Sequence, residues 1–149
     1  VPALAELSVP IVAAHLVVFW YVETGQVTPP VALAAFAASG IARCDPNKAG
    51  FAAVRLASPL LITPVLFVYT PILLNGPTPA IIETVVSATI GFVAYAGMMQ
   101  GFWFKRTPPL ERVLLGLAAV CLFIPSIYTD LVGLAILAGV TVLNRKHAA

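Results

Sequence analysis

The chain has 149 residues, of which 60% are hydrophobic and 9% are charged, with a formal net charge of +2 and a mean hydropathy of +1.00. These values lie outside the range of soluble domains, and a chain of this length has too little polar surface to enclose five or six long apolar runs. Composition therefore indicates an integral membrane protein, and the small positive excess, which is not gathered on a soluble face, argues against nucleic acid as a partner.

The apolar runs do not alternate with polar residues in segments of about ten, as the strands of a membrane barrel do. The sequence therefore predicts an all-α integral membrane protein, a polytopic helical bundle within the lipid bilayer. The expected helices cover residues 7–22, 30–42, 56–74 and 81–104, followed by two shorter arms at 110–123 and 131–143.

The first two expected helices are separated by a proline pair within YVETGQVTPPVALAAFAASGIA. Pro29 and Pro30 lack N–H groups, and Pro29 also disfavours helical backbone at Thr28. Residues 25–30 should therefore unwind and leave carbonyl groups free. Interrupted membrane helices are tolerated where protein or water satisfies their backbone, and transporters use such breaks to bind ions and substrates.

The break supplies the candidate binding site for an ion or a substrate. Oxygens from exposed carbonyls and from the side chains of Thr24, Gln26 and Thr28 suit a hard cation, so we expect sodium near Gly25 and Thr28. A kink without any ligand is the alternative interpretation. The candidate residues are Glu23, Thr24, Gly25, Gln26, Thr28, Pro29 and Pro30, and no catalytic residue, cofactor or other metal site is expected.

Glu23 allows two interpretations. A carboxylate inside a membrane is rare and is by default a candidate ligand for a proton or a cation. A position at the outer membrane edge, where water would solvate the carboxylate beside the turn, explains the same residue without a site.

The segment RCDPNKAGFAAVR connects the second and third expected helices. Asp45 can cap a helix that begins at Pro46, which suggests a lead-in helix lying on the membrane surface. An ordinary cytoplasmic loop with solvated charges is the alternative. The two cysteines, Cys44 and Cys121, are far apart and have no CxxC partner, so we expect packing residues and no disulfide or metal site.

The last two arms are joined by IPSIYTD. The second arm, residues 131–143, would be roughly 20 Å long at 1.5 Å per residue, which is less than the hydrocarbon core of about 30 Å. We therefore expect a hairpin that need not cross fully, with Asp130 capping the last helix.

Basic residues predict the orientation. They occur in three clusters, at Arg43, Lys48 and Arg55, at Lys105, Arg106 and Arg112, and at Arg145 and Lys146. The connections around residues 24–29, 75–79 and 126–130 contain no Lys or Arg. By the positive-inside rule the three clusters face the cytoplasm, so we expect a multi-pass membrane protein with a cytoplasmic C-terminus.

Three stretches resemble a known family. VTPPVALAAFAASGIARCDPNKAGFAAVRL and the following LLITPVLFVYTPILLNG are similar to segments near the end of the large membrane subunit of TRAP (tripartite ATP-independent periplasmic) transporters. The tail, ERVLLGLAAVCLFIPSIYTDLVGLAILAG, resembles the extra C-terminal region of the TAXI-type fused permeases. The resemblance covers nearly the whole chain.

This resemblance implies secondary active uptake. A periplasmic substrate-binding protein delivers an organic anion, and the permease imports it by an elevator-like motion driven by a sodium or proton gradient. Residues 1–76 would end the transport domain, with the broken helix and the span 56–74, and residues 77–149 would form a C-terminal membrane region. Thr28, Pro29 and Pro30 match the motif that lies beside the family's ion and substrate sites, whereas Glu23, Gly25 and Thr70 depart from the family pattern.

The opening residues lack the basic region and cleavage site of a signal peptide, so we expect the C-terminal part of a longer permease, with the remaining transmembrane helices as partners. A separate, non-transporting assembly or scaffold subunit is the alternative. An enzyme is not expected, because the sequence has no catalytic triad, HExxH motif, carboxylate cluster or Gly-rich phosphate loop.

Overall fold

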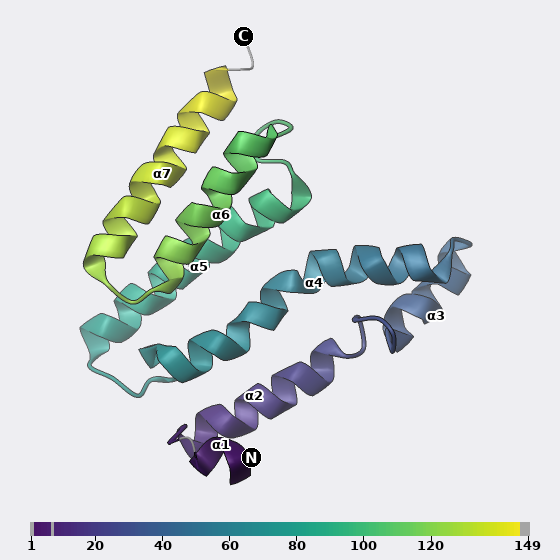
Figure 1. Cartoon of the computed structure of the whole chain (residues 1–149), viewed down its shortest axis with the longest axis horizontal. Helices are drawn as coiled ribbons and strands as arrows, with labels where there is room; N and C mark the ends of the chain where they lie inside the picture. The colour runs from purple at the N-terminus through teal and green to yellow at the C-terminus, as the bar shows by residue number, and fades with distance from the viewer. Residues whose placement is uncertain (1, 7, 147–149) are drawn as a thin grey trace. The chain divides into compact units, whose positions relative to one another are not determined.

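The structure is a computed structural model that describes residues 2–6 and 8–146. Within these residues the chain is helical, and extended pairing is confined to an isolated bridge between Phe102 and Arg106. The elements in chain order are α1 (Pro2–Glu6), α2 (Ile11–Thr24), α3 (Leu33–Ala42), α4 (Pro46–Tyr69), the 3-10 helix η1 (Pro71–Leu73), α5 (Thr78–Gln100), α6 (Pro109–Phe123) and α7 (Ile127–Lys146) (Figure 1).

The chain divides into two compact units, Val1–Tyr69 and Thr70–Ala149, here called the N-terminal and C-terminal units. Each unit is described by itself. Three of the described helices, α4, α5 and α7, are long and apolar enough to cross a membrane, and α2 and α3 are shorter apolar helices. The predicted class, a polytopic helical membrane protein with a proline-broken helix, is therefore confirmed.

The long helix of the N-terminal unit, α4, contains two prolines, Pro59 and Pro64, and is bent along its length (Figure 1). Pro59 has no N–H for the carbonyl of Arg55, and the hydroxyl of Ser58 donates to that carbonyl at 2.8 Å instead. Such side-chain donors are how membrane helices satisfy backbone groups that proline leaves free. The two prolines thus bend α4 without ending it.

Helix α2 packs along α4 through small and aromatic residues. Ala13 and Ala14 are fully buried, which lets the two backbones approach closely. The ring of Trp20 meets that of Phe67 edge-on with the centroids 5.5 Å apart, and the Tyr21 hydroxyl donates to the Leu61 carbonyl at 3.2 Å. These contacts hold the first half of the broken helix against α4.

The C-terminal unit is a three-helix arrangement in which α6 packs between α5 and α7. Its core consists of Ala94, Leu115, Ala119 and Val140. Close approach relies on glycine: a Cβ at Gly133 of α7 would lie 2.8 Å from Leu122 Cγ and 3.1 Å from the Ala118 carbonyl of α6. The unit is therefore closely packed through small residues.

Several predicted bounds were wrong. The first helix begins at Ile11 (Leu7 lies outside the described residues), the second begins at Leu33, and the fourth is Thr78–Gln100. The expected span 56–74 falls partly in α4, which begins at Pro46, because the lead-in continues into the span without a break, and which ends at Tyr69, before the 3-10 helix η1. The last arm, expected at residues 131–143, is a helix of 20 residues, Ile127–Lys146. It begins before Asp130, which we expected to precede the helix, and continues beyond residue 143.

Asp130 does not cap the last helix. It lies within the first turn of α7, where its N–H donates to the Ser126 carbonyl at 3.0 Å. Its carboxylate is buried and turned toward α5, where Ser87 Oγ donates to Oδ2 at 2.5 Å. Asp130 is therefore an internal link between the first turn of α7 and the middle of α5.

Candidate functional site

The helix is interrupted between Thr24, the last residue of α2, and Leu33, the first residue of α3. The intervening residues 25–32 form successive turns, and the peptide bond between Pro29 and Pro30 is cis. Ala32, with a φ of 40°, is in the left-handed region as the chain enters α3. The break thus falls on the proline pair, and extends to residue 32.

Of the six carbonyl oxygens of residues 25–30 that were expected to be free for a cation, three are engaged inside the break. The Gly25 carbonyl accepts the N–H groups of Thr28 and Ala32, the Thr28 carbonyl also accepts from Ala32, and the Gln26 carbonyl accepts from Ala34 at 3.0 Å. The expectation of free carbonyls is therefore corrected for Gly25, Gln26 and Thr28, because short-range turns satisfy them. The carbonyls of Val27, Pro29 and Pro30 accept no hydrogen bond among the described residues.

The hydroxyls of Thr24 and Thr28 both donate hydrogen bonds to backbone carbonyls in the preceding turn. Thr24 Oγ1 donates to the Tyr21 carbonyl at 2.9 Å, and Thr28 Oγ1 donates to the Thr24 carbonyl at 2.8 Å. Thr24 is buried and Thr28 is half-buried. A hydroxyl that donates its hydrogen keeps its lone pairs, so both oxygens retain the capacity to coordinate a cation.

Glu23 and Gln26 are exposed within the described chain, in contrast to the two threonines. Glu23 and Thr24 nevertheless line one hollow of about 310 Å³, whose other lining residues are Phe19, Trp20, Val27 and Leu60. The hollow is largely apolar, and Glu23 is the one ionisable residue in its lining. The structure therefore brings Glu23 and Thr24 to one hollow, and leaves Gln26 outside its lining.

Gly50 of α4 belongs to the support of the break and was not anticipated. A Cβ at position 50 would lie 3.2 Å from Pro29 Cγ and 3.3 Å from Phe36 Cε1. Pro29 and Phe36 therefore pack against the backbone of Gly50. The signal in the sequence was a glycine on a helix otherwise rich in larger residues, but nothing in the local pattern says which segment packs there.

The turn before α4 agrees with the predicted cap. The Lys48 N–H donates to Asp45 Oδ1 at 2.9 Å, and Pro46 is the first helical residue. Cys44, expected to be a packing residue, is exposed, and Cys121 is half-buried in α6. The prediction for Cys44 was wrong, because its turn projects beyond both α3 and α4.

Residues 1–73, which include the break, Gly50 and all of α4, match the family described as the DctM component of the tripartite ATP-independent periplasmic transporter. No curated protein and no solved structure matches. Residues 1–73, just under half of the chain, are therefore similar to the large permease component of TRAP transporters.

Proposed function

We propose that the chain is the C-terminal part of a TAXI-type fused permease that imports an organic anion, a carboxylate, delivered by a periplasmic substrate-binding protein. One observation carries this proposal: the non-helical residues 25–32 lie inside the stretch that matches the permease family. Broken helices near the membrane midplane are where secondary transporters bind substrates and coupling ions. Uptake is driven by a sodium or proton gradient, as a symport across a bacterial inner membrane.

The coupling cation binds at the break in this proposal. The hydroxyl oxygens of Thr24 and Thr28 and the free carbonyls of Val27, Pro29 and Pro30 are hard oxygen ligands, and the nearby Glu23 carboxylate supplies negative charge. The hollow beside Glu23 and Thr24 gives access to this region. The remaining helices of the permease complete the site.

A scaffold role without transport is the second candidate, and one observation favours it for part of the chain. Residues 74–149, which contain α5, α6 and α7, fall outside the family match. Their close glycine-mediated packing needs no ligand to explain it. We assign this stretch to support of the membrane assembly.

The experiment is transport by the complete permease in proteoliposomes with its binding protein present. Sodium and pH gradients are imposed separately, and uptake of a radiolabelled carboxylate is measured. Uptake that follows one gradient and collapses with an ionophore for that ion supports the proposal. A reconstituted permease that moves no anion under either gradient, although it is correctly folded and binds its partner, supports the scaffold role.

A further inference from the structure

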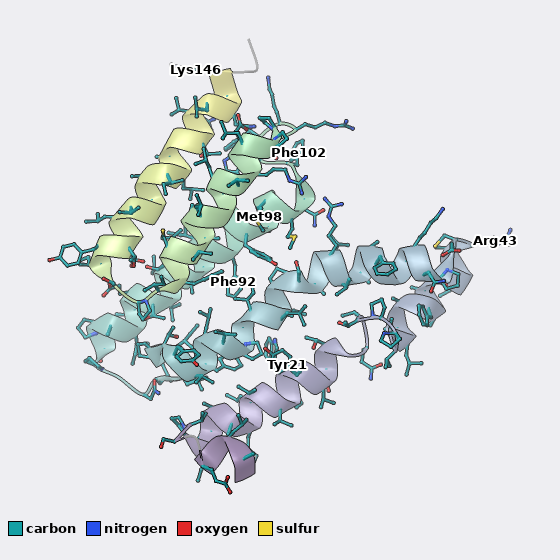
Figure 2. All side chains as sticks on the ribbon, viewed as in Figure 1. Tyr21, Arg43, Phe92, Met98, Phe102 and Lys146 are labelled. Carbon is teal, nitrogen blue, oxygen red and sulfur yellow. The ribbon has the colours of Figure 1, made fainter. Side chains whose placement is uncertain are left out.

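The C-terminal unit has one strongly basic end. Five cationic side chains occur where the loop 101–108, the start of α6 and the end of α7 meet, and Glu111 is the one acid there among the described residues, which leaves an excess of four positive charges (five minus one). The five residues, here called the basic end, are Lys105, Arg106, Arg112, Arg145 and Lys146. Figure 2 shows Phe102 and Lys146 at this same end of the unit.

Hydrogen bonds hold the loop against α7. Asn144 Oδ1 accepts the N–H groups of Phe104 and Lys105 at 3.2 and 3.1 Å, and Asn144 Nδ2 donates to Glu111 Oε2 at 2.7 Å. Trp103 Nε1 donates to Thr141 Oγ1 at 3.0 Å. Because Asn144 and Glu111 are buried, the basic side chains project from a fixed support and not from a loose loop.

Arg112 lies in the first turn of α6 and contacts the end of α5. Its Nε donates to the Met98 carbonyl at 3.0 Å, and its guanidinium carbon lies 3.5 Å from where a Cβ would stand at Gly101. Its other N–H groups make no hydrogen bond within the described residues. A hollow of about 280 Å³ opens beside it, lined by Met98, Pro109, Arg112 and Val113.

Apolar side chains adjoin the cations. Phe102 is 55% exposed, Phe104 is 51% exposed and Leu110 is 70% exposed, and the Arg145 guanidinium lies over the Phe104 ring at 4.4 Å from its centroid. A soluble anion would use the charge but not these apolar groups. A phospholipid uses both, because its phosphate lies beside the hydrocarbon boundary where aromatic side chains are favoured.

We propose that the basic end binds the phosphate of an anionic membrane phospholipid, with the Arg112 guanidinium at the hollow as its central contact. The planar guanidinium matches the oxygens of a phosphate. Basic pockets between membrane helices are known to recognise anionic headgroups in this way. Arg106 and Lys146 add charge at the rim, and Phe102 and Leu110 contact the acyl chains.

The test measures retention of phosphatidylglycerol by the purified chain, using native mass spectrometry after detergent exchange, with phosphatidylcholine as the neutral comparison. The variant is Arg106→Gln with Arg112→Gln. The matched control removes the same charge from the N-terminal unit, as Arg43→Gln with Lys48→Gln. We expect about tenfold weaker phosphatidylglycerol binding in the first variant and less than about twofold change in the control.

Three results would overturn the proposal. Equal losses in the two double variants would mean attraction by overall charge alone. No loss in the Arg106 and Arg112 variant would mean that the site does not exist. Displacement of the lipid by inorganic phosphate at equal concentration would mean a site for soluble phosphate.

A second variant covers the case in which loss of Arg112 disturbs folding through its bond to Met98. Arg106→Gln with Lys146→Gln leaves that bond in place. It should weaken phosphatidylglycerol binding several-fold with an unchanged helical spectrum, and binding equal to that of the unaltered chain would count against the proposal.

Discussion

Pro29 and Gly50 are in direct contact, so close that a Cβ on residue 50 would lie 3.2 Å from Pro29 Cγ. Residue 50 is in the first turns of α4, within what the sequence presented as a linker to the membrane span. The broken helix is therefore seated on a segment that comes after it in the chain. Packing at Gly50 sets the position of the proline pair.

Replacing Gly50 with Leu should displace Pro29 and Phe36 and destabilise the N-terminal unit by about 1–3 kcal/mol, as overpacking does. Thermal unfolding of the purified chain in detergent measures this. Gly40→Leu is the matched control, because a Cβ at Gly40 has nothing within 4 Å. Equal unfolding temperatures for the two variants would show that the break does not depend on α4.

Removing both prolines should let the helix close. Proline disfavours a helix interior by about 3 kcal/mol relative to alanine, so Pro29→Ala with Pro30→Ala favours continuous helix through residues 25–32. We expect the complete permease to insert normally and to lose ion-driven uptake in proteoliposomes. Pro64→Ala is the control, since that proline lies inside α4 and does not interrupt it.

Thr28→Ala tests the same site more mildly. The change removes one hydroxyl, which donates to the Thr24 carbonyl, and leaves the turns in place. We expect a several-fold higher half-saturating ion concentration with unchanged binding of the substrate-binding protein. Unaltered ion dependence in both this variant and the proline variant would identify the break as a packing kink.

The sequence allowed the break and the Asp45 cap to be predicted because both depend on local chemistry. Proline lacks an N–H wherever it occurs, and an aspartate before a Pro-led helix has few other partners. The contact between Pro29 and Gly50 could not be predicted, because the sequence around a glycine does not indicate which segment packs against it. The engaged carbonyls of Gly25 and Gln26 were missed for a related reason, because two of their donors, Ala32 and Ala34, lie beyond the expected end of the break at residue 30.

Asp130 shows that a charged residue between apolar runs need not mark the end of a helix. Its position after IPSIYT suggested the end of a loop, yet Ile127 begins the helix and the carboxylate is satisfied on one side by Ser87 of α5. A partner 43 residues away leaves no local signal. The predicted length of α7 was too short because the run was counted from the charge.

Ser87→Ala should destabilise the C-terminal unit by about 1–3 kcal/mol, because it removes the donor to a buried carboxylate whose other oxygen, Oδ1, has no partner among the described residues. Thr89→Ala is the control on the same helix. Its hydroxyl is exposed and bonds only the Val85 carbonyl. Thermal unfolding that drops equally in both variants would contradict a specific link between α5 and α7.

The orientation can be tested with single cysteines. Native Cys44 is exposed in a turn beside Arg43, and Asn75 is exposed in the connection without basic residues. The positive-inside rule places Cys44 in the cytoplasm and residue 75 outside. A membrane-impermeant maleimide added to intact cells should therefore label Asn75→Cys in a Cys44→Ser, Cys121→Ser background. The same reagent should not label Cys44 in a chain that carries only Cys121→Ser.

Arg106→Cys in the same background is the second inside reporter. Arg106 is exposed, whereas its neighbour Thr107 is buried with its hydroxyl enclosed. A cysteine at position 107 would therefore fail to react from either side of the membrane. We expect Arg106→Cys to be labelled only after the cells are made permeable. Arg106 belongs to a basic cluster, as does Arg43 beside Cys44, and both clusters are expected to face the cytoplasm. Labelling of Arg106→Cys in intact cells, with Asn75→Cys protected, would reverse the topology and place the basic end on the outer face.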